Sequence, residues 1–252
     1  MEIEAAILPP QLRAEKLCKQ YALRIQSFSS SHPIRRALLW QKQNSKGLHT
    51  QLQKLASTAE YSNVEEISTL HAKPWSKPAT AYATIAISRE SKEIAAERHQ
   101  QWLDGLHQTT TTTTTSTACP ILLYTDGSKR EEKVAAGYCQ LARGKFIQAR
   151  NFNLGKRQEI MDAELYAIQE ALQYLANQDL LGEDVYIFVD SQAALKRLQS
   201  VTLQGGQMLC HRITKLCRRL AAASNKVTLE WVPGHNNIQG NEHADRLARA
   251  GL

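Results

Sequence analysis

Long apolar runs are missing from this sequence of 252 residues. All of them fall far short of the roughly 20 residues that a membrane span needs, so we expect no membrane partner. The first residues, MEIEAAILPPQLRAEK, lack the basic start and the apolar core of a secretory signal. We therefore expect an intracellular protein, nuclear or cytoplasmic.

Cysteine is scarce and shows no pattern. The count of five is odd, the spacing is wide, and no Cys-x-x-Cys pair occurs. A disulfide framework or a cysteine zinc site is not expected from such a set. We expect reduced, partly buried thiols and no small-molecule cofactor. The cysteines are Cys18, Cys119, Cys139, Cys210 and Cys217.

Charge of one sign is not concentrated anywhere along the chain. The net charge is +7, from 31 basic and 24 acidic residues, and no run of five or six like charges marks a basic tail. This excess permits a polyanionic partner without requiring one. Charge alone therefore leaves the class of partner open.

The most distinct boundary is a threonine tract that begins at Thr109. Polar β-branched residues without apolar periodicity cannot build a core, so the tract indicates an exposed linker. No internal repeat is present. We expect a helical N-terminal or connecting segment over residues 1–107, a linker over 108–118 and a folded domain over 119–252.

The two sides of the tract differ in pattern. Before it, apolar residues at near-helical spacing predict helices over 11–28, 34–43 and 91–106, without a cluster of chemically competent residues. After it, short apolar runs alternate with helical segments, which predicts an α/β fold with a mixed five-stranded sheet flanked by helices. The expected strands are 121–126, 134–142, 145–152, 184–190 and 226–232, and the expected helices are 159–177, 191–199, 207–223 and 237–250.

Two carboxylates directly follow apolar strands. Asp126 comes after ILLYT, and Asp190 comes after VYIFV. In α/β sheets, ligand crevices open at the carboxyl ends of strands. Asp126 is also compatible with a turn before Gly127-Ser128, and Asp190 with a helix N-cap. If the strands are parallel neighbours, the two carboxylates lie close together.

Two further carboxylates lie on predicted helices. Glu164 sits at the edge of the apolar stripe of its helix, where an unpaired charge is costly. Asp245 lies beside the apolar face of the last helix, although a surface aspartate near a helix N-terminus is an alternative. Together the four acids could form one cluster. Oxygen ligands of this kind suit Mg²⁺ or Mn²⁺, and two such ions can catalyse an in-line displacement.

Five motifs then appear in one fixed order: YTDGS (124–128), DAELYAI (162–168), VDSQAAL (189–195), WVPGH (231–235) and GNEHADRLA (240–248). The segment that carries them resembles type 1 ribonuclease H, and most of all the ribonuclease H domains of non-LTR retrotransposon polyproteins. All four acidic positions of the family are filled, by Asp126, Glu164, Asp190 and Asp245.

The resemblance implies a mechanism and a substrate. Two Mg²⁺ ions, or Mn²⁺, held by the four acids would support hydrolysis of the RNA strand of an RNA/DNA hybrid, with 5′-phosphate and 3′-hydroxyl ends. His235 matches a mobile-loop histidine of the family that assists proton transfer or product release, although a plain loop histidine is the alternative. The matching substrate contacts are Gly127, Ser128, Gln192 and Asn241.

The N-terminal forty residues are similar to the segment that follows the polymerase in such polyproteins, although no Tyr-x-Asp-Asp sequence is present. Other parts of a reverse transcriptase polyprotein are therefore possible partners. The segment over 207–223 runs straight into the last strand and lacks the extra basic helix with which some family members grip DNA. A non-cleaving nucleic-acid-binding relic is the first alternative function, and a DNA-cutting nuclease of the same fold is the second.

Overall fold

The structure, a computed structural model, describes residues 9–37, 76–112, 119–156, 158–200 and 206–252, and of residues 107–112 the backbone alone. The chain forms two compact units: one contains the helix α1 (Pro10–Gln26) and the helical residues 33–37, and the other contains the remaining described helices and strands. α1 confirms the helix predicted over 11–28. Of the helix predicted over 34–43, residues 38–43 lie outside the described part.

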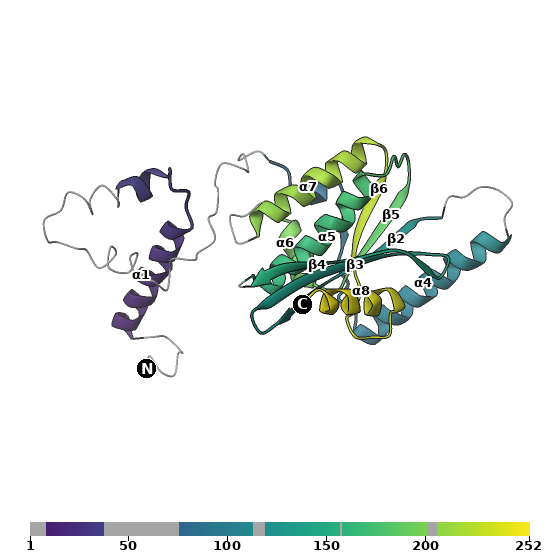
Figure 1. The fold of residues 1–252 in the computed structure, drawn as a ribbon, viewed down its shortest axis with the longest axis horizontal. Coiled ribbons are helices and arrows are strands. Elements are labelled where there is room, and N and C mark those ends of the chain that lie inside the picture. The colour runs from purple at the N-terminus through teal and green to yellow at the C-terminus, as the bar shows by residue number, and fades with distance from the viewer. Residues whose placement is uncertain (1–8, 38–75, 113–118, 157, 201–205) are drawn as a thin grey trace, which may run out of the picture. The chain divides into compact units, whose positions relative to one another are not determined.

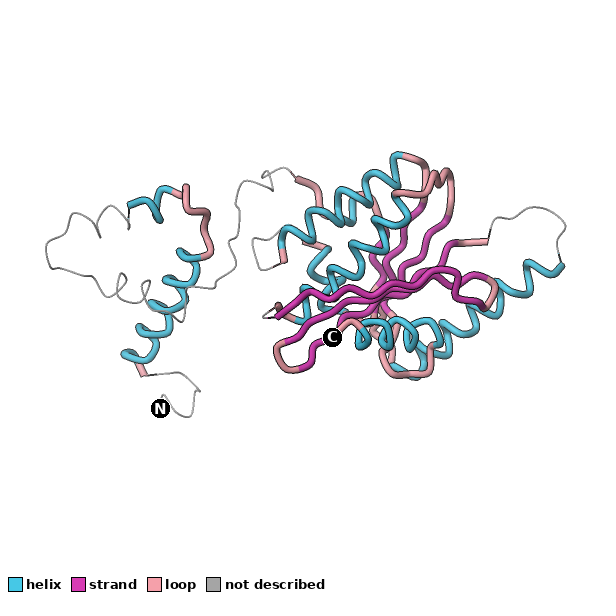
Figure 2. The backbone as a smooth tube through the Cα atoms, in the orientation of Figure 1, coloured by secondary structure: helices cyan, strands magenta, loops and turns pink. Residues whose placement is uncertain are grey.

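The second unit is built on one mixed sheet of six strands in the order β1-β6-β5-β2-β3-β4 (Figures 1 and 2). β1, β6, β5 and β2 run parallel, and β2, β3 and β4 pair antiparallel. The strands are β1 (Thr84–Ala86), β2 (Ile121–Arg130), β3 (Lys133–Ala142), β4 (Lys145–Lys156), β5 (Asp184–Val189) and β6 (Lys226–Trp231).

The predicted α/β class and the predicted element order after residue 119 are confirmed, but the predicted number of five strands is wrong. The additional strand is β1, which pairs with β6 along the edge of the sheet. β1 is too short to show an alternating pattern of its own. The strands predicted over 134–142 and 145–152 form a hairpin, β3 and β4, that turns at Arg143 and Gly144, both with positive φ.

Helices cover both faces of the sheet (Figure 1). α5, α6 and α7 pack on one face, and α8 packs on the other, where α4 lies beside it. The helices of this unit are η2 (Ala79–Ala81), α4 (Lys92–Thr112), α5 (Ile160–Ala176), α6 (Gln192–Leu198), α7 (Gln207–Ala222) and α8 (Gln239–Ala250). In the part of the chain that the structure describes, no helix has the length and apolar character of a membrane-spanning segment.

Successive residues of the central strands face opposite layers. Leu123 and Ile187 belong to the core under α5 and α7, whereas Tyr124 and Phe188 belong to the core under α4 and α8. This double burial explains why β2 and β5 read as continuous apolar runs rather than as alternating ones. It also holds the two strands rigidly at the centre of the sheet.

α4 comes from the chain before the predicted linker, yet it packs on the sheet. Trp102 packs against Tyr186 with ring centroids 4.8 Å apart and ring planes tilted by 57°. The helix was expected to end near Gly105 but continues to Thr112, since extending an existing helix costs little even through threonine. The described part of this compact unit thus begins at residue 76, before the predicted linker, and the division at residues 108–118 stays a prediction.

A buried histidine joins α4 to the sheet. His99 Nε2 lies 2.9 Å from the Tyr124 hydroxyl, and the imidazole packs edge-on against Phe188. Burial lowers the pKa of His99 to about 4, followed by a smaller effect of Arg98. The native protein therefore keeps this imidazole neutral at pH values where an unfolded chain protonates it.

Acid is expected to loosen this contact. The folded pKa of His99 lies below the unfolded value near 6.5. The contribution of the neutral imidazole to the stability of the folded protein is therefore complete above pH 6.5 and is lost as the pH falls toward 4. The difference corresponds to about 3 kcal/mol between pH 7 and pH 4. Urea unfolding across this range should show the loss in wild type and a smaller one in His99→Gln. Equal pH dependence in both proteins would contradict the assignment.

Candidate active site

Asp126 and Asp190 emerge together from two neighbouring parallel strands. The last residues that pair between β2 and β5 are Thr125 and Val189, and each acid comes next in the chain. The register therefore places the two carboxylates side by side, after the last residues that pair between β2 and β5, as predicted for parallel neighbours.

The alternative of a turn at Gly127-Ser128 is wrong. β2 continues to Arg130 and pairs with β3, so Asp126 lies opposite Gly137 inside an antiparallel ladder. The chain turns at Glu131, where φ is 56°. Pairing with β3 continues after β5 has ended, so β3 holds the backbone of Asp126 and of the residues before and after it.

Glu164 enters from above the sheet on the first turns of α5. A capping box fixes the start of this helix, because the Glu159 backbone N–H donates to Asp162 at 3.0 Å and the Glu159 side chain accepts from the Asp162 backbone. Glu164 is only 8% exposed, which confirms that it faces the core side. Its Oε2 is buried without a hydrogen-bond partner among the described atoms.

Gly127 allows α5 to approach β2 closely enough to deliver Glu164. A Cβ at this position would lie 2.7 Å from the Glu164 backbone nitrogen and 2.9 Å from the Ala163 Cβ. One of these atoms belongs to the helix backbone and the other is a Cβ, so neither can be moved away by a change of side-chain rotamer. The glycine therefore has a packing role, and its contact with RNA stays a prediction.

Gly127→Ala is expected to displace Glu164. Pushing α5 away from β2 should lower the free energy of unfolding by about 1–3 kcal/mol and lower any cleavage activity at least about tenfold. Gly105→Ala is a suitable control, since a Cβ there meets nothing within 4 Å. Thermal melting and cleavage rates would check both variants. Wild-type activity in Gly127→Ala would show that the close approach is not needed.

The three acids form one compact cluster. Asp126, Glu164 and Asp190 each offer a carboxylate oxygen within 4.8 Å of the others. Burial, then Asp190 and Asp245, raise the pKa of Asp126 to about 8. Burial, then Asp190 and Asp126, raise the pKa of Glu164 well above its usual value. The crowded charges thus favour either bound protons or a bound cation.

Asp245 completes the cluster from α8. It is 8% exposed, and a hydrogen bond between Asp245 and Asp126 adds to the raised pKa of Asp126. Arg249, one turn later on the same helix, contacts Asp245 Oδ1 with Nε at 2.8 Å. All four predicted acids therefore converge, and the alternative of a surface position for Asp245 does not hold.

Asp190 is held in place by residues that were not predicted to contact it. The Trp231 indole N–H donates to the Asp190 backbone carbonyl at 3.0 Å, and a Cβ on Gly234 would lie 2.8 Å from Asp190 Oδ2. Both residues belong to the WVPGH motif, which marked them without explaining them. Burial raises the pKa of Asp190, and the amide of Asn241 opposes this increase.

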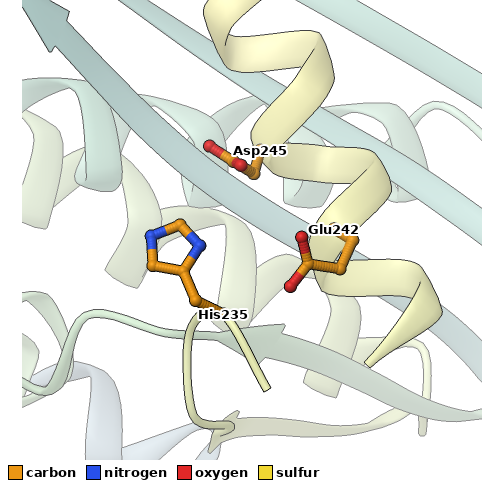
Figure 3. Close-up of side chains that lie close together, drawn as sticks. All are labelled: His235, Glu242 and Asp245. Atoms are coloured by element: carbon orange, nitrogen blue, oxygen red, sulfur yellow. The ribbon is translucent and has the colours of Figure 1, made fainter. Parts of the chain in front are cut away.

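His235 lies on the loop before α8 and faces that helix. It forms a second group with Glu242 and Asp245, with ligand atoms within 4.8 Å of one another (Figure 3). The imidazole is exposed, and the residue has a φ of 58°. Glu242 was not predicted as a site residue, although its position three residues before Asp245 places both on one helix face.

The four predicted substrate contacts lie at different depths. Asn241 is buried, and its Nδ2 donates to Asp190 Oδ2 at 3.4 Å, so it contacts the acid cluster directly. Ser128 and Gln192 are half-buried, on β2 and at the start of α6. Gln192 Oε1 accepts from Lys196 Nζ at 3.2 Å. The roles of these residues toward a substrate stay predictions.

The cluster fits a divalent cation on its own chemistry. Its donors are carboxylate oxygens, one of which, Glu164 Oε2, is buried and unpartnered among the described atoms. Carboxylates that burial makes hard to ionise are stabilised by a cation placed between them. Hard ions such as Mg²⁺ and Mn²⁺ prefer this donor set.

Comparison with known proteins gives one family. A model of the RNase H family matches residues 119–252, slightly more than half of the chain and all four acids of the cluster. The RNase H1 of the halophilic archaeon Halobacterium salinarum NRC-1 is 24% identical over 53% of this chain and 97% of its own, with a TM-score of 0.42. LC11-RNase H1, solved in complex with an RNA/DNA hybrid, is 19% identical over 52% of this chain and 99% of its own, with a TM-score of 0.42.

Proposed function

Because the chain belongs to the ribonuclease H family, we propose that it hydrolyses the RNA strand of RNA/DNA hybrids and leaves 5′-phosphate and 3′-hydroxyl ends. The observation that carries this proposal is the convergence of four carboxylates on one buried cluster. An acidic pocket repels a phosphodiester unless cations occupy it. The proposal therefore includes two divalent ions, Mg²⁺ or Mn²⁺.

In this proposal, the four acids hold the two ions and other residues hold the acids in place. Asp126, Glu164 and Asp190 would hold one ion, and Asp126 with Asp245 would hold the other. When bound, the ions supply stabilisation of the attacking and leaving oxygens of an in-line displacement. Trp231 and Asn241 keep Asp190 in place through their hydrogen bonds.

His235 has a separate role in the proposal. It is the exposed member of its group and stands beside Asp245, so its imidazole can move a proton at the edge of the cluster. Glu242 lies on the same helix as Asp245, and its carboxylate is also near the imidazole (Figure 3).

A cleavage assay tests the function. The purified chain with Mg²⁺ should cut end-labelled RNA in an RNA/DNA hybrid but leave single-stranded RNA and duplex DNA intact. Asp190→Asn should be inactive, and a 5′-phosphate-dependent exonuclease should degrade the downstream product. Hybrid binding without turnover in Mg²⁺ or Mn²⁺ would favour a binding relic instead. Preferred cleavage of duplex DNA would favour a DNA-cutting nuclease.

The origin and location of the chain are further proposals. The likeness of DAELYAI and VDSQAAL to retrotransposon domains supports derivation from a non-LTR retrotransposon polyprotein, other parts of which would be partners. A reverse transcriptase sequence in the same transcript would support this origin, and a transcript without one would oppose it. We also propose an intracellular, nuclear or cytoplasmic location, which fractionation of cells with a tagged chain would test.

A further inference from the structure

A basic groove runs between α5 and α7, away from the acid cluster. Its volume is about 730 Å³. Four cations from α7 and two amides from α5 give the groove its polar character. The residues of this basic groove are Arg212, Lys215, Arg218 and Arg219, with Gln169 and Gln173 and the apolar Leu216 and Ala222.

The cations of α7 form a row rather than a scatter. Arg212, Lys215 and Arg219 are spaced i, i+3 and i+7, which places them on one face of the helix. At 1.5 Å per residue the row is about 10 Å long. That length corresponds to about three nucleotides of a strand at 3.4 Å per nucleotide along the helix axis.

The four cations of the basic groove are exposed, and no ion pair among the described residues neutralises them. None of the described residues that line the basic groove is acidic. Within the described parts of the chain, none of its four cations makes an ion pair within 4.0 Å. Exposed cations held in a row without acidic partners create a positive surface that attracts a polyanion.

The wall formed by α5 supplies a second, independent sign of a ligand. Gln169 is only 7% exposed, and its Nε2 donates to Glu170 at 3.0 Å. Its Oε1 is buried and has no hydrogen-bond partner among the described atoms. A buried acceptor of this kind is costly unless a donor reaches it, and a 2′-hydroxyl or a base amine is such a donor.

The basic groove is distinct from the acid cluster. Gln169 and Gln173 follow Glu164 by five and nine residues on α5, which turns them by about 140° and 180° around the helix axis. A strand in the groove therefore does not occupy the position of the strand that meets the carboxylates. The groove is a second surface for the same class of partner.

We propose that the basic groove binds the sugar-phosphate backbone of a nucleic acid, at a place separate from the acid cluster. The choice of nucleic acid as the polyanion rests on the proposed function. The three aligned cations Arg212, Lys215 and Arg219 contact consecutive phosphates, and the amides of α5 contact the sugars or bases beside them.

The test compares hybrid binding by the whole chain and by the neutral triple variant Arg212→Gln/Lys215→Gln/Arg219→Gln. Fluorescence anisotropy in EDTA, over a series of salt concentrations, avoids any dependence on cleavage. Loss of three phosphate contacts should reduce the slope of log K against log salt by about 2.7. It should weaken binding at least about tenfold at 0.1 M salt. Labelled single-stranded RNA and single-stranded DNA, measured in parallel, show which backbone the groove holds.

A charge-conserving variant, Arg212→Lys/Lys215→Arg/Arg219→Lys, is the matched control and should keep the wild-type slope. Thermal melting of both variants separates a binding defect from a folding defect. A wild-type slope in the folded neutral variant would overturn the assignment and leave an acidic protein segment as the occupant. Because the measurement needs no metal, a chain that fails to cleave can still bind through the groove, and a chain that cleaves can still lack this contact.

Discussion

Asp126→Asn is expected to unfold at a higher temperature than wild type in the absence of metal, while losing cleavage activity. The pKa of Asp126 is raised to about 8 in the folded protein, mainly by burial and by Asp190, against about 3.9 in an unfolded chain. Folding therefore takes up a proton between these values, so wild-type stability falls as the pH rises from 4 toward 8. The neutral amide avoids this cost.

The size of the stability effect follows from the same shift. Because the proton is shared within a cluster of acids, we expect a gain of about 3 kcal/mol at pH 8, or about 5–10 °C in melting temperature. The gain should vanish near pH 4, where both proteins carry a neutral group. Melting curves in EDTA at pH 4, 6 and 8 would measure it. Asp179→Asn, an exposed aspartate, serves as the control.

Although Asp126→Asn should be more stable than wild type without metal, it should bind Mg²⁺ less well and cleave more slowly. Mg²⁺ should raise the melting temperature of wild type and have little effect on Asp126→Asn, because the cluster has lost a central ligand. Cleavage should fall at least about 10³-fold, corresponding to the several kcal/mol that metal ions supply to such reactions. If metal-free Asp126→Asn is less stable than metal-free wild type at pH 8, ionised Asp126 does not destabilise the folded protein and the prediction is wrong.

The second large effect concerns residues before the family domain. A fragment of residues 119–252 is expected to be unstable and to aggregate, whereas a fragment of residues 76–252 should fold. α4 covers the sheet face that contains Tyr124, Tyr186 and Phe188, with Trp102 and neighbouring apolar residues packed against it. Without α4, this aromatic face becomes an exposed apolar patch.

A single substitution measures the same contact in the whole chain. Trp102→Ala should lower the free energy of unfolding by about 2–4 kcal/mol. This is somewhat less than for a fully buried tryptophan, because Trp102 is half-buried. Glu97→Ala, at an exposed position of α4, should change it little. Urea unfolding would compare the two variants. A fragment of residues 119–252 as stable as the longer one would show that α4 is dispensable.

Much of the site could be predicted because it depends on local patterns. Asp126 and Asp190 each follow an apolar strand, and Glu164 stands at the edge of an apolar stripe. Local sequence patterns alone therefore indicated where each carboxylate lies on its strand or helix. Their convergence required the parallel pairing of β2 and β5, which the sequence left as a condition and which the register shows. The roles of these residues in catalysis remain predictions.

The features that were missed depend on contacts between distant segments. β1 has three residues, too few for any periodicity, and is a strand only because β6 lies beside it. Trp231 holds Asp190 across 41 residues of sequence. The row of cations on α7 was visible in the sequence, but the groove that it lines with α5 was not.

β1 also sets a condition on how the chain folds. Its partner strand lies far downstream, since Thr84 pairs with Thr228, which is 228 − 84 = 144 residues later. At roughly 5–20 residues per second of synthesis, the segment that becomes β1 waits about 7–30 s for its partner. Such a long-range pairing is also slow to form in refolding. During that interval α4 has no completed sheet to cover, so its apolar side must avoid aggregation until the last strand of the domain has been made.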